Sequence, residues 1–245
     1  GIFTSMKQKQ FAQINVLYED NHLIIVDKKA GDLVHDDITK DKTLSDKIKE
    51  YIKAKYEKPG EVFLGVIHRL DRPVSGLIAF ARTSKCLVRM NEMLQQKQLH
   101  KTYFALTQKK LAAQRGTLVH WIVKSSSQNK VNIYNTKPSL KDAKEAIMEY
   151  EIVGENGGYY LWKLNPLTGR PHQIRAQLSA VGCPIINDLK YGAAETDDPH
   201  SIYLRSGILA FTHPVQKIEI IAQALSENDG LWGLFDLRKF SIKSP

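Results

Sequence analysis

The segment "HRLDRPVSG", residues 68–76, places titratable side chains between two apolar stretches, residues 62–67 and 77–81. Its Asp71 has three ordinary roles: it forms a turn, joins a structural ion pair, or is a reactive group held by a rigid scaffold. Burying a carboxylate is costly unless a cation pairs with it. The candidate cations are Arg69 and Arg72 beside it and Arg175 far along the chain. The local pattern leaves all three roles open.

Several other catalytic chemistries lack their sequence signatures. The chain contains no G-x-x-x-x-G-K-[ST], G-x-G-x-x-G, G-x-S-x-G or H-E-x-x-H pattern. His68, His172 and His213 show no ligand spacing with acids, and a lone histidine is more often structural than a metal ligand. Cys86 and Cys183 are too far apart to indicate a disulfide framework or a cysteine zinc site. The residues alone therefore indicate no metal site and no Rossmann-type cofactor site.

The size of the chain limits its organisation. Its 245 residues, 42% of them hydrophobic, suffice for one sizeable core or at most two small domains. No apolar run approaches the ~20 residues that span a bilayer, and the N-terminus lacks the apolar region of a signal peptide. We therefore expect a cytoplasmic protein without membrane contact. Residues 1–10 are expected to be a flexible tail or a cloning remnant, and residues 11–245 one domain.

The net charge of +9 is concentrated in one segment. Residues 82–115 hold eight Lys or Arg and a single acid, Glu92. A basic segment of this kind is either a solvated helix face or a surface for an acidic partner such as a nucleic acid. Charge alone does not decide between the two.

Hydrophobic periodicity predicts helices over residues 43–56, 83–98 and 171–182. Pro171 suits the first turn of the third helix, and Gly182 ends it. Strands are expected in residues 14–28, 62–67, 76–81, 101–107, 116–123, 146–167 and 208–223. The predicted fold class is α+β: a single domain with a large mixed, mostly antiparallel sheet flanked by helices and loops.

Five stretches of the sequence resemble the RluA-like pseudouridine synthase family. "HRLDRPVSGL" resembles its H-R-L-D-x-x-x-S-G signature, and the other four follow in family order between about residue 15 and about residue 222. They are "KTYFAL" (101–106), "TGRPHQIRAQL" (168–178), "NDLKYG" (187–192) and "LAFTHP" (209–214). Because the five matches are spread in order over that range, the resemblance covers most of the chain.

The resemblance implies an isomerase that converts uridine to pseudouridine in structured ribosomal or transfer RNA, with no cofactor. It implies that Asp71 is the nucleophile or base, that Tyr103 stacks on the uracil and assists proton removal, and that Arg175 pairs with the aspartate. We expect this pairing to be bidentate, keeping Asp71 ionised and oriented. In this family Asp188 is structural. The domain over residues 11–245 is then the catalytic domain.

RNA contacts are expected near the same site. By resemblance, Arg69 fills the space left by a flipped nucleotide and stacks on neighbouring bases. The further predicted contacts are Lys101, His68, Arg72, Arg170 and His172, with the basic segment contacting phosphates. We expect a monomer that binds RNA, without the S4 module that many relatives carry.

Four departures from the family pattern put the substrate in doubt but remove no catalytic group. Asn187 stands where the family has Gly, Gln177 where it often has His, Val74 where it often has Thr, and Arg205 where His is frequent. Two alternatives remain: a non-catalytic RNA-binding protein of the same fold, and an acid-dependent hydrolase of nucleosides or sugars. The hydrolase needs a second carboxylate for acid–base work, for which Asp188 is the candidate.

Overall fold

A computed structural model describes residues 14–34, 42–125, 127–194, 198 and 200–243. The expected tail, residues 1–10, lies outside these ranges. Within these ranges, eleven strands form one sheet in the order β1-β2-β4-β10-β5-β9-β8-β6-β7, with β3 paired to β4 and β11 to β10. Its pairings are antiparallel except β4 with β10. The predicted α+β class with a mixed, mostly antiparallel sheet is confirmed.

Most strands lie where hydrophobic runs and alternation predict them, but the strand at Lys130–Tyr134 was not predicted. Their bounds are β1 Asn15–Glu19, β2 Leu23–Lys28, β3 Gly65–Val66, β4 Ser75–Ala81, β5 His100–Thr107, β6 Arg115–Ser125, β7 Lys130–Tyr134, β8 Lys144–Asn156, β9 Tyr159–Pro166, β10 Leu204–Thr212 and β11 Glu219–Gln223. The helices are α2 Leu44–Lys55, α3 Ser84–Gln95 and α4 Gln173–Ala180, with short 3-10 turns at Leu189–Tyr191, Gly230–Leu234 and Leu237–Phe240.

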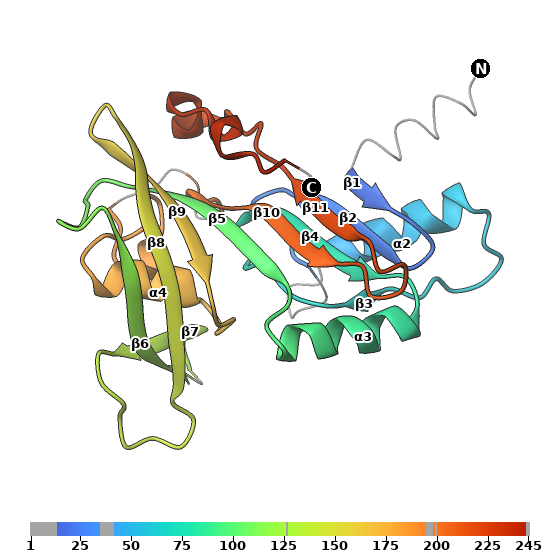
Figure 1. Cartoon of the computed structure of the whole chain (residues 1–245), viewed down its shortest axis with the longest axis horizontal. Helices are drawn as coiled ribbons and strands as arrows, with labels where there is room; N and C mark the ends of the chain where they lie inside the picture. Colours follow the sequence, from blue (N-terminus) through green and yellow to red (C-terminus); the bar gives the residue numbers. More distant parts are fainter. Residues whose placement is uncertain (1–13, 35–41, 126, 195–197, 199, 244–245) are drawn as a thin grey trace.

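Strand β4 is buried on both faces, which explains its continuous apolar sequence. Its side chains alternate between two clusters: Ile78 faces the cluster that includes helix α2, and Leu77 faces the cluster that includes helix α3. The two helices therefore cover opposite faces of the β2–β4 region (Figure 1). Capping hydroxyls of Thr43 and Thr83 begin these helices, as their sequences predict.

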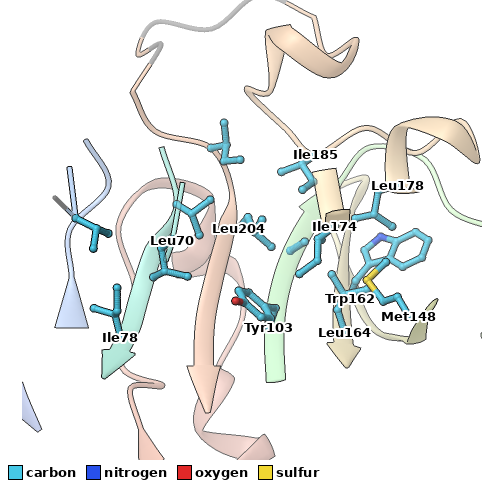
Figure 2. Close-up of a cluster of buried hydrophobic side chains, with 14 of the residues drawn as sticks. Leu70, Ile78, Tyr103, Met148, Trp162, Leu164, Ile174, Leu178, Ile185 and Leu204 are labelled. Atoms are coloured by element: carbon cyan, nitrogen blue, oxygen red, sulfur yellow. The ribbon is translucent and has the colours of Figure 1, made fainter. Parts of the chain in front are cut away.

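The first cluster continues beneath helix α4, in the other half of the sheet. Figure 2 shows Ile174 and Leu178 of α4 beside Trp162 and Leu164 of β9, with Tyr103 in the same layer. This packing fixes the backbone of helix α4 against the strands. The residues on either side of its buried side chains are therefore fixed in position as well.

Two local predictions are wrong. The apolar run 62–67 was expected to be a strand, but only Gly65–Val66 pair with β4, and Phe63 is exposed. Helix α4 begins after His172 rather than at Pro171, because His172 adopts a left-handed backbone, with a φ of 52°, at the N-cap. No helix in the part of the chain described here is long and apolar enough to cross a membrane.

Candidate active site

Asp71 lies in the connection between β3 and β4, and several contacts fix that connection. The amide of Val74 donates to the Asp71 carbonyl at 2.9 Å, closing a turn. The buried Lys28 ammonium donates to three carbonyls, those of Lys29, Asp32 and Arg72, at 2.7–3.0 Å. Burial lowers the pKa of Lys28 to about 8. Asp71 therefore sits on a loop whose backbone is held from within the protein.

Gly76, at the end of this loop, permits a close approach of two strands. Its φ of +117° disfavours other residues, and an added Cβ would lie 2.2 Å from the carbonyl oxygen of Ser206 on β10. This crossing is also where β4 and β10 pair, through Arg205 with Ser75 and Ser206 with Gly76. Gly76 thus brings the Asp71 loop against β10.

Arg175 of α4 contacts Asp71, but its main partner is Asp188. Its Nη1 lies 3.3 Å from Asp71 Oδ2, whereas Nε and Nη2 each donate to a different oxygen of Asp188 at 2.8 Å. The expected bidentate pair with Asp71 is therefore wrong. Asp188 is 1% exposed, so it compensates the buried guanidinium and holds one nitrogen toward Asp71.

Two further groups fix the same arginine and extend the site. The Arg175 guanidinium stacks on the ring of Tyr191, 5.0 Å from its centroid. The Tyr191 hydroxyl lies 2.6 Å from Nδ1 of His172, whose Nε2 lies 3.8 Å from Asp71 Oδ1. The two oxygens of Asp71 thus face different partners, Arg175 and His172.

Tyr103 reaches this site from β5. Its ring is 8% exposed and packs with Leu70, Leu204 and Ile174 (Figure 2). Burial, and secondarily the negative charge of Asp71, raises the pKa of Tyr103 above its ordinary value. The phenol therefore stays protonated at neutral pH, and it lies within electrostatic range of Asp71.

The predicted RNA contacts next to Asp71 divide into exposed and enclosed groups. Arg69 is exposed, which suits contact with a nucleic acid. His68 is 8% exposed, and its Nε2 accepts the amide hydrogen of Ala79 at 2.9 Å, in a gap of the sheet. Arg72 donates from Nε to the Gly31 carbonyl at 2.9 Å. The geometry therefore favours structural roles for His68 and Arg72, and their RNA contacts stay predictions.

Lys101, two positions before Tyr103 on β5, is a half-buried cation for which the described residues provide no hydrogen-bond acceptor. Burial lowers its pKa to about 8. Arg170 donates from Nε to the Glu145 carbonyl at 2.8 Å and is partly exposed. By contrast, the basic helix α3 packs in the cluster on the face of β4 opposite to that of Tyr103. Of the basic segment, Lys101 lies on the strand that carries Tyr103.

Sequence reasoning missed the roles of three residues around this site. Tyr191 was expected only as part of the stretch "NDLKYG". Asp188 was expected to be structural or, in a hydrolase, to be the second carboxylate, and its pairing with Arg175 was not expected. Arg205 was noted as a departure; it is buried and donates to Ser75 Oγ at 3.1 Å and to Asp27 at 2.6 Å, which supports the start of β4. Asn187 has a φ of 75°, a conformation that asparagine tolerates better than most residues, so it replaces the family's glycine without difficulty.

A partly exposed carboxylate held by an arginine, with a buried tyrosine nearby, can act as a nucleophile or a base on a planar ligand. Among the described residues, no group of three or more His, Cys, Asp or Glu is arranged to bind a metal ion.

Known proteins share this arrangement of sequence and fold. The "Ribosomal large subunit pseudouridine synthase C" of Buchnera aphidicola is 29% identical over 216 residues, covering 85% of this chain and 66% of the relative. An uncharacterized RNA pseudouridine synthase of Mycoplasma genitalium is 30% identical over 203 residues, covering 82% of this chain and 63% of the relative. The chain thus spans just under two thirds of the length of these curated relatives.

Solved structures agree in fold. "Human RNA Pseudouridylate Synthase Domain Containing 4" superposes with a TM-score of 0.74 at 20% identity, covering 96% of both chains. The family model described as RNA pseudouridylate synthase matches residues 22–180, which include Asp71, Tyr103 and Arg175. Since that match spans well over half of the sequence, the chain belongs to the RNA pseudouridylate synthase family.

Proposed function

We propose that this protein is an RNA pseudouridine synthase that isomerises uridine in structured RNA. The observation that carries the proposal is the position of Asp71, a side chain 31% exposed that faces Arg175 on one oxygen and His172 on the other. Such a carboxylate is accessible to a flipped nucleotide and is held in one orientation. Asp71 acts as the nucleophile or base, Arg175 orients it, and Tyr103 contacts the uracil.

Base flipping explains the neighbouring residues. A uridine in a stack cannot reach a carboxylate in a loop, so the nucleotide leaves the stack at a cost of a few kcal/mol. Arg69, exposed two positions before Asp71, stacks in the vacated space. Lys101 binds a phosphate of the same strand. The substrate is ribosomal or transfer RNA, and the protein acts as a cytoplasmic monomer.

Asp188 is not placed to serve as the second carboxylate that a hydrolase needs. Asp188 is 1% exposed, and both of its oxygens accept hydrogen bonds from Arg175. A general acid or base must reach the reacting group within hydrogen-bond distance, and this side chain is directed at the arginine instead. An isomerisation, which retains uracil in the pocket, requires only one carboxylate, that of Asp71.

Tritium release tests the proposal. RNA carrying tritium at uracil carbon-5, from cells that lack this protein, is treated with the wild type, with Asp71→Asn and with the remote control Asp236→Asn. Forming the new bond at carbon-5 expels the tritium, so we expect release by the wild type and the control but not by Asp71→Asn. Release of free uracil would indicate a hydrolase, and full activity of Asp71→Asn would refute the assigned role.

A further inference from the structure

His172 is held in an unusual position beside Asp71. It is a non-glycine residue with a φ of 52°, and this left-handed conformation aims its ring between Asp71 and Tyr191. Its two ring nitrogens face different groups: Nδ1 faces the Tyr191 hydroxyl at 2.6 Å, and Nε2 faces Asp71 Oδ1 at 3.8 Å. The tautomer of His172 therefore decides whether Asp71 faces a donor or a lone pair.

The hydrogen bonds of Tyr191 indicate which tautomer is present. Its hydroxyl accepts the amide hydrogen of Val131 at 3.0 Å, so its own proton is free to be donated. Within the described parts of the chain, Nδ1 of His172 is the acceptor in reach. When Tyr191 donates to Nδ1, the ring proton must reside on Nε2, which points at Asp71.

We infer that Tyr191 makes His172 a positioning residue for Asp71, by fixing the tautomer whose Nε2–H is directed at Oδ1. Each carboxylate oxygen then faces a donor, Arg175 for Oδ2 and His172 for Oδ1. Because the two donors face different oxygens of the carboxylate, its orientation is fixed before a substrate arrives. The inference rests on the proposed function for its catalytic meaning, but not for its geometry.

The charges around His172 favour its neutral form. Burial is the largest cause that lowers its pKa, and the positive charges of Arg175 and Lys190 add to it, while Asp71 and Asp188 oppose it. The Lys130 ammonium lies 5.5 Å from the centroid of the Tyr191 ring. An imidazolium would need a second ring proton on Nδ1, the atom to which the Tyr191 hydroxyl donates its hydrogen bond. Tyr191 therefore keeps His172 neutral as well as oriented.

Tyr191→Phe removes the hydroxyl while keeping the ring on which Arg175 stacks. Tyr203→Phe is the matched control, since the Tyr203 hydroxyl also accepts a backbone amide at 3.0 Å, that of Leu231, but packs against Trp232. Nitrogen-15 NMR of histidine-labelled protein reports tautomer and pKa without RNA, and His172→Asn identifies the signal. Asparagine is chosen because it tolerates the left-handed backbone.

In the wild type and in Tyr203→Phe we expect protonated Nε2, bare Nδ1 and a pKa below the ordinary ~6.5 of histidine. In Tyr191→Phe we expect the pKa of His172 to rise by about half a unit or more. A proton on Nδ1 in the wild type would overturn the inference, even if Tyr191→Phe did not fold. An unchanged pKa in folded Tyr191→Phe would overturn it too.

Turnover gives the catalytic arm of the test. If the proposed function is correct, kcat falls in Tyr191→Phe but not in Tyr203→Phe, because the tautomer of His172 with its proton on Nε2 is no longer fixed. His172→Asn should lower kcat about tenfold with little change in KM, because positioning acts on the reacting group. An equal loss through KM would overturn the positioning role. Absence of turnover in every protein would contradict the proposed function, while the NMR result would still decide the tautomer.

Discussion

Substituting Gly76 with alanine separates two costs that the structure makes distinct. The first is the backbone strain of a φ of +117°, about 1–2 kcal/mol for an L-residue. The second is a collision, since the new Cβ would lie 2.2 Å from Ser206 O and 2.5 Å from Ser206 N, where ordinary contacts are 3.4–4 Å. Strand β10 must therefore move by about an ångström relative to β4.

That movement breaks the only pairing of β4 with β10 among the described residues, Arg205 with Ser75 and Ser206 with Gly76. Each lost ladder hydrogen bond costs about 1 kcal/mol. Together with the strain, Gly76→Ala should lower the free energy of unfolding by about 3 kcal/mol or more. Because Asp71 lies in the adjoining loop, we also expect turnover to fall by about 100-fold.

Urea denaturation followed by circular dichroism measures the first effect, with Gly158→Ala as the matched control. Gly158 has a φ of +85° and nothing within 4 Å of an added Cβ, so its substitution carries the strain without the collision. We expect the control to lose about 1–2 kcal/mol. Equal losses in the two variants would show that the approach of β4 and β10 is not limiting, and the reasoning would fail.

Three other predictions follow from the same contacts. Asp188→Asn should lower the free energy of unfolding by about 3 kcal/mol, because it leaves the charge of the buried Arg175 undercompensated. The control is Asp236→Asn, which removes the charge of an exposed pair with Arg238. No loss is expected for this control in the same urea titration. RNA affinity should weaken as pH rises through about 8, where Lys101 loses its proton; filter binding should show this for the wild type but not for Lys101→Met. Burial alone would raise the pKa of Asp20, but hydrogen bonds from the Tyr18 hydroxyl and from backbone amides lower it overall. The Asp20 carboxylate therefore stabilises the fold at pH values above the pKa that it has in the unfolded chain, and this stabilisation is lost as pH falls below about 4. In thermal melts, the difference in melting temperature between wild type and Asp20→Asn should therefore disappear below that pH.

The sequence predicted most elements because their signals are local. Helix α2 has its Thr43 cap and its apolar spacing within 14 residues, and strand β4 is one uninterrupted apolar run. Residues 62–64 look equally strand-like, yet whether they pair depends on a neighbouring strand that no local pattern specifies. The same is true of α4, whose start is fixed by the left-handed His172 rather than by Pro171.

The sequence identified part of the candidate site. Asp71, Tyr103 and Arg175 came from three of the five stretches that follow in family order, and the contact of Arg175 with Asp71 was expected. That Arg175 would take Asp188 as its bidentate partner was not predicted, because no sequence pattern shows which carboxylate the fold brings within reach of two of its nitrogens. Tyr191 and His172 had no pattern that linked them, since they are 19 residues apart and meet only through the fold.

The pairing of β4 with β10 has a kinetic consequence for the nascent chain. Ser75 and Arg205 are 130 residues apart, so their contact closes a long loop and forms only after most of the chain has been made. Arg175 and Asp71 are 104 residues apart and likewise come into contact only when the chain folds. A partly synthesised or half-folded chain therefore carries Asp71 without its partners, and we expect the ability to act on RNA to appear in a single late step of folding.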